Sequence, residues 1–226
     1  MKRILPLITA VLSCTAAFAQ QHADRAPRIL EDKPGFRAVL DDDGGRVETF
    51  RRAETTRELE FHGGTVVREP LAHAVFLGDW SANAAQREAL VRATTRIANT
   101  ADLRQLDFAG VHRPVAFTGT TNLAAGPRLN DLHVQSALAT ALHDGRLAQR
   151  DERVIYIVFL APGTKSTLGD HDGSTDYDSY HSHFHAEDVD VRYVVVPYRE
   201  DAGAMMSAAA TSVARAVINP DGDGWY

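Results

Sequence analysis

The sequence predicts an α/β fold, in which one layered domain packs helices on a mixed β-sheet. Two runs, Val154–Leu160 and Val191–Val196, consist mainly of β-branched and aromatic residues. Strands without polar alternation are covered on both faces, so both runs are expected at the centre of the sheet. Segments with helical spacing of apolar residues lie between and after them. This alternation is typical of a single-domain α/β sandwich.

The first part of this domain is expected to contain one strand and one helix. Leu71–Leu77 is an apolar run that ends at Gly78, which indicates a strand followed by a turn. Asn83, with Gln86 three residues later, resembles a capping box at a helix start. Apolar residues then keep helical spacing as far as Ala101.

The middle of the domain repeats this order. Pro114 places the short strand Val115–Phe117 at a sheet edge or at a strand start, because proline cannot donate to a ladder. Asn130 is suited to cap the next helix, Asp131–Asp144, and Gly145 is suited to end it. After the strand Val191–Val196, a last helix is expected over Ala202–Val217, packed on the sheet.

The N-terminus resembles a secretory signal peptide. Lys2 and Arg3 form a basic region, Ile4–Leu12 is an apolar core, and Ala17–Ala19 fits a cleavage site before Gln20. We therefore predict a secreted or periplasmic protein, cleaved after Ala19. The alternative is a lipoprotein anchored at Cys14, but the residues before Cys14 suit it poorly.

Residues 20–62 are polar, dense in charge and poor in aliphatic side chains. Gly44 and Gly45 indicate a turn between Phe36–Leu40 and Val47–Phe50, consistent with a hairpin. We interpret residues 20–62 as an N-terminal extension, partly disordered, joined to the α/β domain of residues 63–226.

Composition excludes several classes of function. Cys14 is the only cysteine and would leave with the signal peptide, so disulfides, a cysteine nucleophile and thiolate metal ligands are excluded in the exported chain. The net charge of −6 argues against binding to nucleic acid or anionic lipid. No stretch after the signal is long and apolar enough for a transmembrane helix.

The segment Gly169–Asp190 holds four of the ten histidines among six aspartates and one glutamate. As a strand, it would place the imidazoles of His181, His183 and His185 on one face; as a helix, His181 and His185 would lie one turn apart. Imidazole and carboxylate suit zinc or another transition metal better than calcium. The alternative is a solvated loop without a fixed metal. The candidate ligands are His171, Asp172, His181, His183, His185 and Glu187.

Several blocks of the chain, taken in order, resemble one family. Together they resemble the exordium (phosphate-induced protein 1) family of plant extracellular proteins and secreted bacterial homologues, over residues 63–226. Plant members are associated with extracellular control of cell expansion, and the family's biochemical activity is unassigned. The blocks are Gly64–Trp80, Leu129–Gly145 with the following VIYIVFLAPGT, Tyr180–Ser182, Val194–Tyr198 and Ala214–Tyr226.

The resemblance also bears on catalysis. Bacterial members tend to end in a helix resembling SHELAEAVTDP, with the ligand spacing of a zincin metallopeptidase, which implies a zincin-like variant of the sandwich. In this chain Thr211 replaces the histidine, while Ser212 and Arg215 replace the two glutamates. Guanidinium has no lone pair for a metal, so we expect no metallopeptidase site on this helix. His181 matches the histidine of the family's YHS motif.

Three functions are compatible with these patterns. The leading hypothesis is a non-catalytic, exordium-like secreted protein with a binding or cell-envelope role, an extracellular or envelope ligand, and possible transition-metal binding at the histidine segment. The alternative is a metal-dependent, peptidase-like hydrolase that uses the relocated histidines, with Asp172, Asp176 or Glu187 as ligand or base. The third is a periplasmic metal-capture protein. Trp80 and Trp225 could mark a carbohydrate-stacking surface, although core packing is the favoured interpretation for both.

Overall fold

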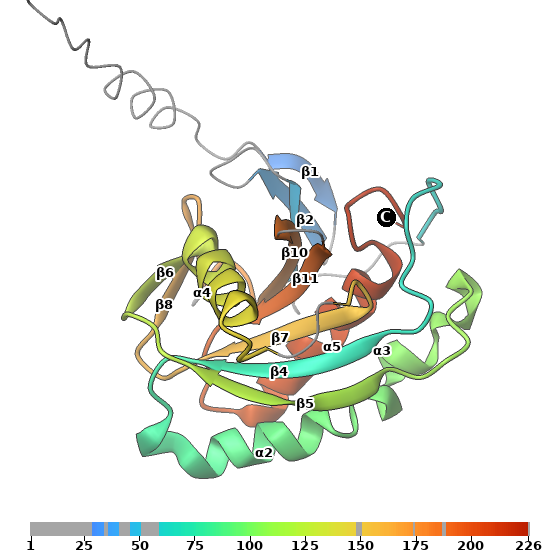
Figure 1. Cartoon of the computed structure of the whole chain (residues 1–226). Helices are drawn as coiled ribbons and strands as arrows, with labels where there is room; N and C mark the ends of the chain where they lie inside the picture. The colour runs from blue at the N-terminus through green and yellow to red at the C-terminus, as the bar shows by residue number, and fades with distance from the viewer. Residues whose placement is uncertain are drawn as a thin grey trace, which may run out of the picture.

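The computed structural model describes residues 29–33, 36–40, 46–50, 59–147, 151–173, 175–186 and 189–225. Its main element is a mixed sheet of eight strands in the order β1-β2-β3-β10-β11-β7-β4-β5, shown in Figure 1. A second sheet has the order β6-β8-β9. The strands are β1 (Ile29–Lys33), β2 (Phe36–Leu40), β3 (Arg46–Phe50), β4 (Leu71–Leu77), β5 (Ala116–Leu123), β6 (Arg128–Asn130), β7 (Val154–Leu160), β8 (Lys165–Leu168), β9 (His171–Asp172), β10 (Ser179–Ala186) and β11 (Val189–Val196).

Parallel pairing joins the middle of the main sheet. β11 pairs with β7, β7 with β4, and β4 with β5, all in parallel. β10 is antiparallel to both β11 and β3. The prediction of central strands is confirmed, since every residue of Val154–Leu160 is buried and so is every residue of Val191–Val196. The mixed α/β sheet predicted from the sequence is therefore present.

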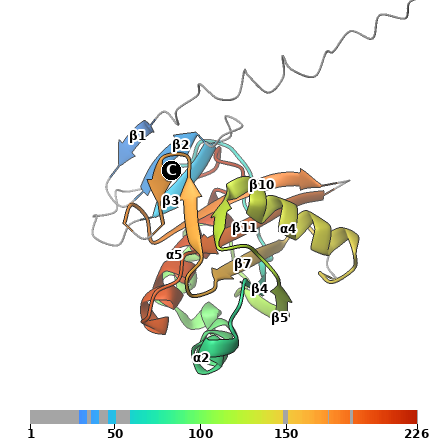
Figure 2. The same ribbon diagram turned by 90° about the vertical axis from the view of Figure 1, so that its left-hand side faces the viewer.

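Helices cover both faces of the sheet. We call the face covered by α2, α3 and α5 the α5 side, and the face covered by α4 the α4 side; Figure 1 shows α4 and α2 on opposite faces. The 90° view in Figure 2 shows the same separation. The helices are α2 (Ala84–Thr94), α3 (Ala101–Arg104), α4 (Asp131–His143) and α5 (Ala202–Ile218).

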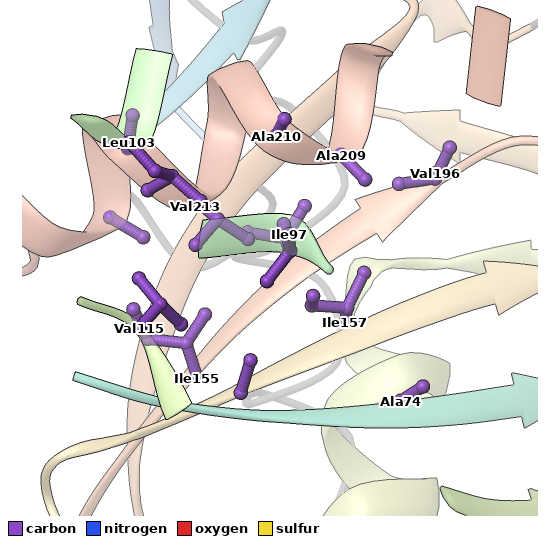
Figure 3. Packing of buried hydrophobic residues seen from close by; sticks show 14 of the residues in the cluster. Ala74, Ile97, Leu103, Val115, Ile155, Ile157, Val196, Ala209, Ala210 and Val213 are labelled. Carbon is purple, nitrogen blue, oxygen red and sulfur yellow. The ribbon is translucent and has the colours of Figure 1, made fainter. Parts of the chain in front are cut away.

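The α5 side is packed mainly with small and branched side chains. Ala209 and Val213 of α5 lie over Ile157 of β7 and Val196 of β11 in Figure 3. All four side chains are fully buried. Removing such side chains from water stabilises the fold by roughly 25 cal/mol per Å² of apolar surface, so this side supplies much of the folding free energy. Alanines on α5 let the helix approach the sheet closely.

Two expectations for the first helix are wrong. Asn83 precedes α2 but makes no capping hydrogen bond with its side chain, and its amide instead donates to the Tyr198 hydroxyl at 3.3 Å. The Gln86 amide donates to the carbonyl oxygen of Arg199 at 2.6 Å. The capping-box residues therefore anchor the loop after β11. The helical spacing to Ala101 is also interrupted, because α2 ends at Thr94.

Both ends of α4 agree with the sequence prediction. The Asn130 side chain accepts from the backbone N–H of His133, and the His133 ring accepts from the Asn130 backbone, which forms a reciprocal capping box. Gly145 follows α4 with φ of +71°, a conformation that glycine adopts without strain. Asp201 caps α5 by accepting from the Gly203 backbone N–H.

The hairpin expected in residues 20–62 is present, but it is part of the main sheet. β2 pairs with β3, and β3 then pairs with β10. The pairing of β3 with β10 was not expected from the sequence, because these N-terminal strands carry no continuous apolar run. Among the described residues, no helix is long and apolar enough to cross a membrane.

Candidate functional site

The histidine segment forms strand β10, so the strand alternative is confirmed. Its side chains alternate: Tyr180 lies within the core of the α4 side, whereas Ser179 bonds to α5 on the other side. His181, His183 and His185 therefore share the face of the strand that belongs to the α5 side. Burial falls along the strand, from a buried His181 through a half-buried His183 to an exposed His185.

His181 is an anchor for the end of α5. Its Nε2 lies 3.1 Å from the backbone carbonyl oxygen of Asn219, directly after the helix. Since a carbonyl can only accept, this nitrogen is the donor. The side chain is 4% exposed, so His181 holds the helix end from beneath and is not presented to solvent.

The other two histidines lie toward the exposed end of β10. His185 Nδ1 lies 3.0 Å from a carboxylate oxygen of Asp190 across the hairpin, and this hydrogen bond holds the pKa of Asp190 below its usual value. His183 pairs in register with Arg192. A permanent cation opposite His183 disfavours a bound divalent metal at that position.

The remaining candidate ligands do not converge on β10. His171 and Asp172 form β9 in the small sheet, where Asp176 accepts from the Asp172 backbone N–H at 2.8 Å. Glu187 lies outside the described residues. Within the described part of the chain, no three histidine, cysteine, aspartate or glutamate side chains are grouped closely enough to hold a metal ion.

The three positions that match the metallopeptidase-like helix lie on α5. The Ser212 hydroxyl is buried 2.7 Å from the Ser179 hydroxyl of β10, and the Thr211 hydroxyl donates to Asp102 of α3 at 2.7 Å. Arg215 is 5% exposed. The helix does face β10, as a shared site would require. The side chains at these positions, however, are hydroxyls bonded within the fold and a buried guanidinium.

The segment after α5 is a tight turn, which we call the C-terminal turn and define as residues 219–225. The Asn219 side chain accepts from the Gly224 backbone N–H at 2.8 Å, and the Trp225 N–H donates to the carbonyl of Ile218 at 3.1 Å. Asp221 accepts from the buried guanidinium of Arg192, with Nη2 and Oδ1 3.2 Å apart. These bonds tie the turn to β11 and to the end of α5.

Two glycines permit this close packing. A Cβ on Gly64 would collide with Asp223, and a Cβ on Gly224 would collide with the carbonyl oxygen of Ile218. His62 donates its backbone N–H to the Gly224 carbonyl at 2.9 Å. The chain entering the domain therefore lies directly against the C-terminal turn. Blocks quoted for the family resemblance, around Gly64, His181 and Asn219, meet at this one place.

The C-terminal turn presents Trp225 between two exposed rings. The Trp225 ring lies 5.3 Å from that of Phe61 and 4.9 Å from that of Phe108, measured between centroids. Both phenylalanines are 52% exposed. We call Phe61, Phe108 and Trp225 the aromatic face. Core packing is confirmed for Trp80, which is 6% exposed, but Trp225 is only half-buried.

A buried polar network on the α4 side was not expected from the sequence. The hydroxyls of Tyr180 and Tyr193 both lie 2.8 Å from Oδ1 of Asp131 at the start of α4, and the Gln135 amide donates to Oδ2 at 2.8 Å. Burial, reinforced by the Asp131 charge, raises the pKa of both tyrosines well above the usual range. The only signal in the sequence was a charged residue directly after the cap Asn130.

The parallel strands also define a position where α/β proteins often bind ligands. The connection from β4 to β5 passes over the α5 side, and the connection from β5 to β7 passes over the α4 side, so the strand order reverses between β4 and β7. Ligands of such sheets bind at the carboxyl ends of these strands. Here Gly78, with φ of +102°, packs tightly against Ala161, which leaves the two strand ends in direct contact.

His73 is a partly buried histidine on the parallel strand β4. Its two ring nitrogens lie 3.2 Å from the Thr118 hydroxyl and 2.9 Å from the Thr121 hydroxyl of the edge strand β5. Burial lowers the pKa of His73, so the neutral ring is favoured. Both nitrogens contact hydroxyls of β5, which indicates that the side chain fixes this edge strand.

Comparisons of the chain with family models, with curated proteins and with solved structures found no match.

Proposed function

We propose that this chain is a secreted or periplasmic, exordium-like protein that binds a ligand in the cell envelope and does not catalyse a reaction. The C-terminal turn supports this proposal, because it gathers residues from several of the blocks that carry the resemblance. It uses them to hold a half-buried tryptophan beside two exposed rings. Aromatic side chains that a well-packed backbone holds at the surface are typical of recognition sites.

The hydrogen bonds on α5 carry the non-catalytic part of the proposal. Ser212 bonds to Ser179 and Thr211 bonds to Asp102, while Arg215 is buried at the position of the second glutamate. Metal-assisted hydrolysis requires ligands with lone pairs, an open coordination position and a nearby base. The Ser212 and Thr211 hydroxyls instead join α5 to β10 and to α3.

Export is the second part of the proposal. It depends on residues 1–19, which lie outside the described residues. Expression of the full chain in a Gram-negative host, followed by mass spectrometry of the periplasmic form, should find Gln20 at the N-terminus. A diacylglyceryl group on Cys14 would instead make the protein membrane-anchored.

Transition-metal binding at the histidine segment is the alternative binding role. The shared face of His181, His183 and His185 favours it, and Glu187 or a carboxylate outside the described residues could complete such a site. Because imidazole must be neutral to bind metal, the affinity should collapse as pH falls through about 6.5. Zinc would be the first ion to test, as imidazole and carboxylate ligands suit it.

Metal analysis and a proteolysis assay on the purified mature protein test the proposal. We expect less than one equivalent of tightly bound zinc and no chelator-sensitive cleavage of casein. The informative variant is the double change His183→Ala/His185→Ala, because replacing the buried His181 would also damage the fold. His171→Ala, in the small sheet, is the matched control.

Three outcomes are distinguishable. Chelator-sensitive proteolysis by the unmodified protein would overturn the non-catalytic proposal in favour of a metal-dependent hydrolase. One equivalent of zinc that the double variant loses and His171→Ala keeps would assign metal capture to β10. Zinc lost only in His171→Ala would move the site to the small sheet.

A further inference from the structure

The aromatic face, Phe61, Phe108 and Trp225, is an unusual surface for this chain. Within the described residues, only three large hydrophobic side chains are strongly exposed, and two of them are Phe61 and Phe108. The third, Leu132, lies on α4. Two exposed phenylalanines beside a half-buried tryptophan are therefore a concentrated feature, and exposed patches of this kind mark interaction sites.

The face is held in place by the fold. Phe61 forms a backbone bridge with Trp225, and Phe108 lies in a short 3-10 helix, Leu106–Ala109. Trp225 itself packs partly against the core of the α5 side. The rings are thus preorganised, so a ligand would lose little affinity to the ordering of side chains.

The area of the face limits the kind of partner. A fully buried aromatic side chain covers about 150–250 Å², and these rings are only partly exposed, so together they offer on the order of 300 Å². A stable protein–protein interface buries roughly 800 Å² on each partner. The aromatic face is too small for a second copy of this chain, but it matches one or two sugar rings.

The charges next to the rings limit the partner further. Glu60 precedes Phe61, Asp107 precedes Phe108, and Asp223 lies two residues before Trp225, all three exposed. Carboxylates repel polyanions such as nucleic acid, acidic polysaccharide or anionic lipid. They accept hydrogen bonds from hydroxyl groups, which are the donors at the rim of a pyranose ring.

We infer that the aromatic face binds a neutral or N-acetylated polysaccharide, by stacking the C–H faces of pyranose rings on Phe61, Phe108 and Trp225. Asp107 and Glu60 accept hydrogen bonds from the sugar hydroxyls. This inference rests on the proposed envelope-binding function and names its ligand class. The C–H faces supply the apolar contact, and the carboxylates give selectivity for uncharged chains.

Tryptophan fluorescence gives a direct test, because the chain has only two tryptophans and Trp80 is buried in the core. In a Trp80→Phe background, Trp225 becomes the reporter. Cellohexaose, laminarihexaose and chitohexaose would be titrated separately into metal-free protein in the presence of a chelator. At least one sugar should shift the emission saturably and protect Trp225 from acrylamide quenching.

Surface variants show whether the response comes from the aromatic face. Phe108→Ala and Phe61→Ala should each weaken binding at least tenfold, and Asp107→Asn should weaken it severalfold. Leu132→Ala removes the third strongly exposed hydrophobic side chain, which lies on α4, and should leave binding unchanged. Circular dichroism of each variant confirms that the fold is kept.

The outcomes that overturn the inference are separate from those that overturn the proposed function. No saturable response to any of the three sugars, or equal binding by Phe108→Ala and Phe61→Ala, would overturn the inference. Self-association abolished by Phe108→Ala would assign the face to a second copy and also overturn it. Cleavage of the bound sugar would overturn only the non-catalytic part of the proposed function, because the sugar would still bind at the aromatic face.

Discussion

The two sides of the main sheet are built in different ways. The core cluster of the α5 side contains aliphatic residues with Phe76, Phe159 and Trp80, and its helix α5 is rich in alanine. The α4 side instead buries tyrosines around a carboxylate: Tyr180 and Tyr193 both bond to Asp131.

Because of this difference, the two sides should respond differently to mutation and to pH. Apolar packing depends on volume and is insensitive to pH, whereas a buried polar network depends on every partner being present and on its protonation. We therefore expect changes of volume to act on the apolar core cluster of the α5 side, and changes of charge or pH to act on the Asp131 network of the α4 side.

The largest expected effect is on a strand shared by both sides. Ile157→Asp in β7 would bury an unpaired carboxylate against α5, where the native side chain is fully buried. The loss of unfolding free energy should exceed about 5 kcal/mol, enough to prevent folding. Thermal unfolding followed by circular dichroism measures it, and Ile157→Val should cost only about 1 kcal/mol. Wild-type stability of Ile157→Asp would contradict the central-strand assignment.

Breaking the network on the α4 side is expected to have the second largest effect. Asp131→Ala removes the acceptor of both tyrosine hydroxyls and leaves these buried donors unsatisfied, at a cost of about 3–5 kcal/mol. Asp131→Asn keeps one oxygen acceptor and should cost less. Urea unfolding of the two variants measures the difference. Equal, small losses in both would mean that Asp131 contributes little.

A smaller effect is expected from overpacking the α5 side. Ala209 is fully buried where α5 lies on the sheet, so Ala209→Leu should cost about 1–3 kcal/mol through displaced side chains. Because no titratable group is added, the loss should be the same at pH 7 and pH 10. Urea unfolding at both values checks this, and a loss that grows with pH would contradict the distinction between the two sides.

The smallest change in stability is expected from alkaline pH. Burial raises the pKa of Tyr156 to about 12, and it also raises the pKa values of Tyr177, Tyr180 and Tyr193, all four on the α4 side. An unfolded tyrosine loses its proton near pH ~10, so above that pH the unfolded state binds fewer protons than the folded state. The contribution of these tyrosines to stability should be constant below pH ~10 and fall above it, by about 1.4 kcal/mol per pH unit for each such tyrosine.

Absorbance at 295 nm gives the measurement for this last prediction. Tyrosine ionisation should appear together with the loss of circular dichroism as pH rises. Ionisation of the full tyrosine signal in a protein that stays folded would show that the α4 side is open to solvent. Tyr180→Phe removes one of the buried hydroxyls and should make the alkaline loss less steep.

The strands β4, β7 and β11 and the cap of α4 could be predicted from the sequence, because they depend on local patterns. Val154–Leu160 has no polar residue, and Asn130 before an apolar helix is a local capping signal. The wrong expectation at Asn83 and Gln86 has a tertiary cause. Both side chains find better partners in the loop after β11, and these lie more than a hundred residues away in the chain.

The candidate site was only partly predictable. Alternation placed His181, His183 and His185 on one face of a strand, but their different burial depends on where α5 ends above them. The pairing of Phe61 with Trp225 joins the beginning of the domain to its end, and no local signal marks it. Residues that are far apart in sequence come together only through the sheet and the C-terminal turn.

By itself, the sequence determined the α/β class, the two central strands and the helix that follows Asp201. Each is specified by hydrophobic periodicity, which acts over a few neighbouring residues. Only the tertiary structure decided that His181 is a buried anchor, that Asp131 is held by two tyrosines, and that Trp225 lies between exposed rings. These roles depend on long-range packing, because burial sets whether a polar or aromatic side chain stabilises the core or meets a ligand.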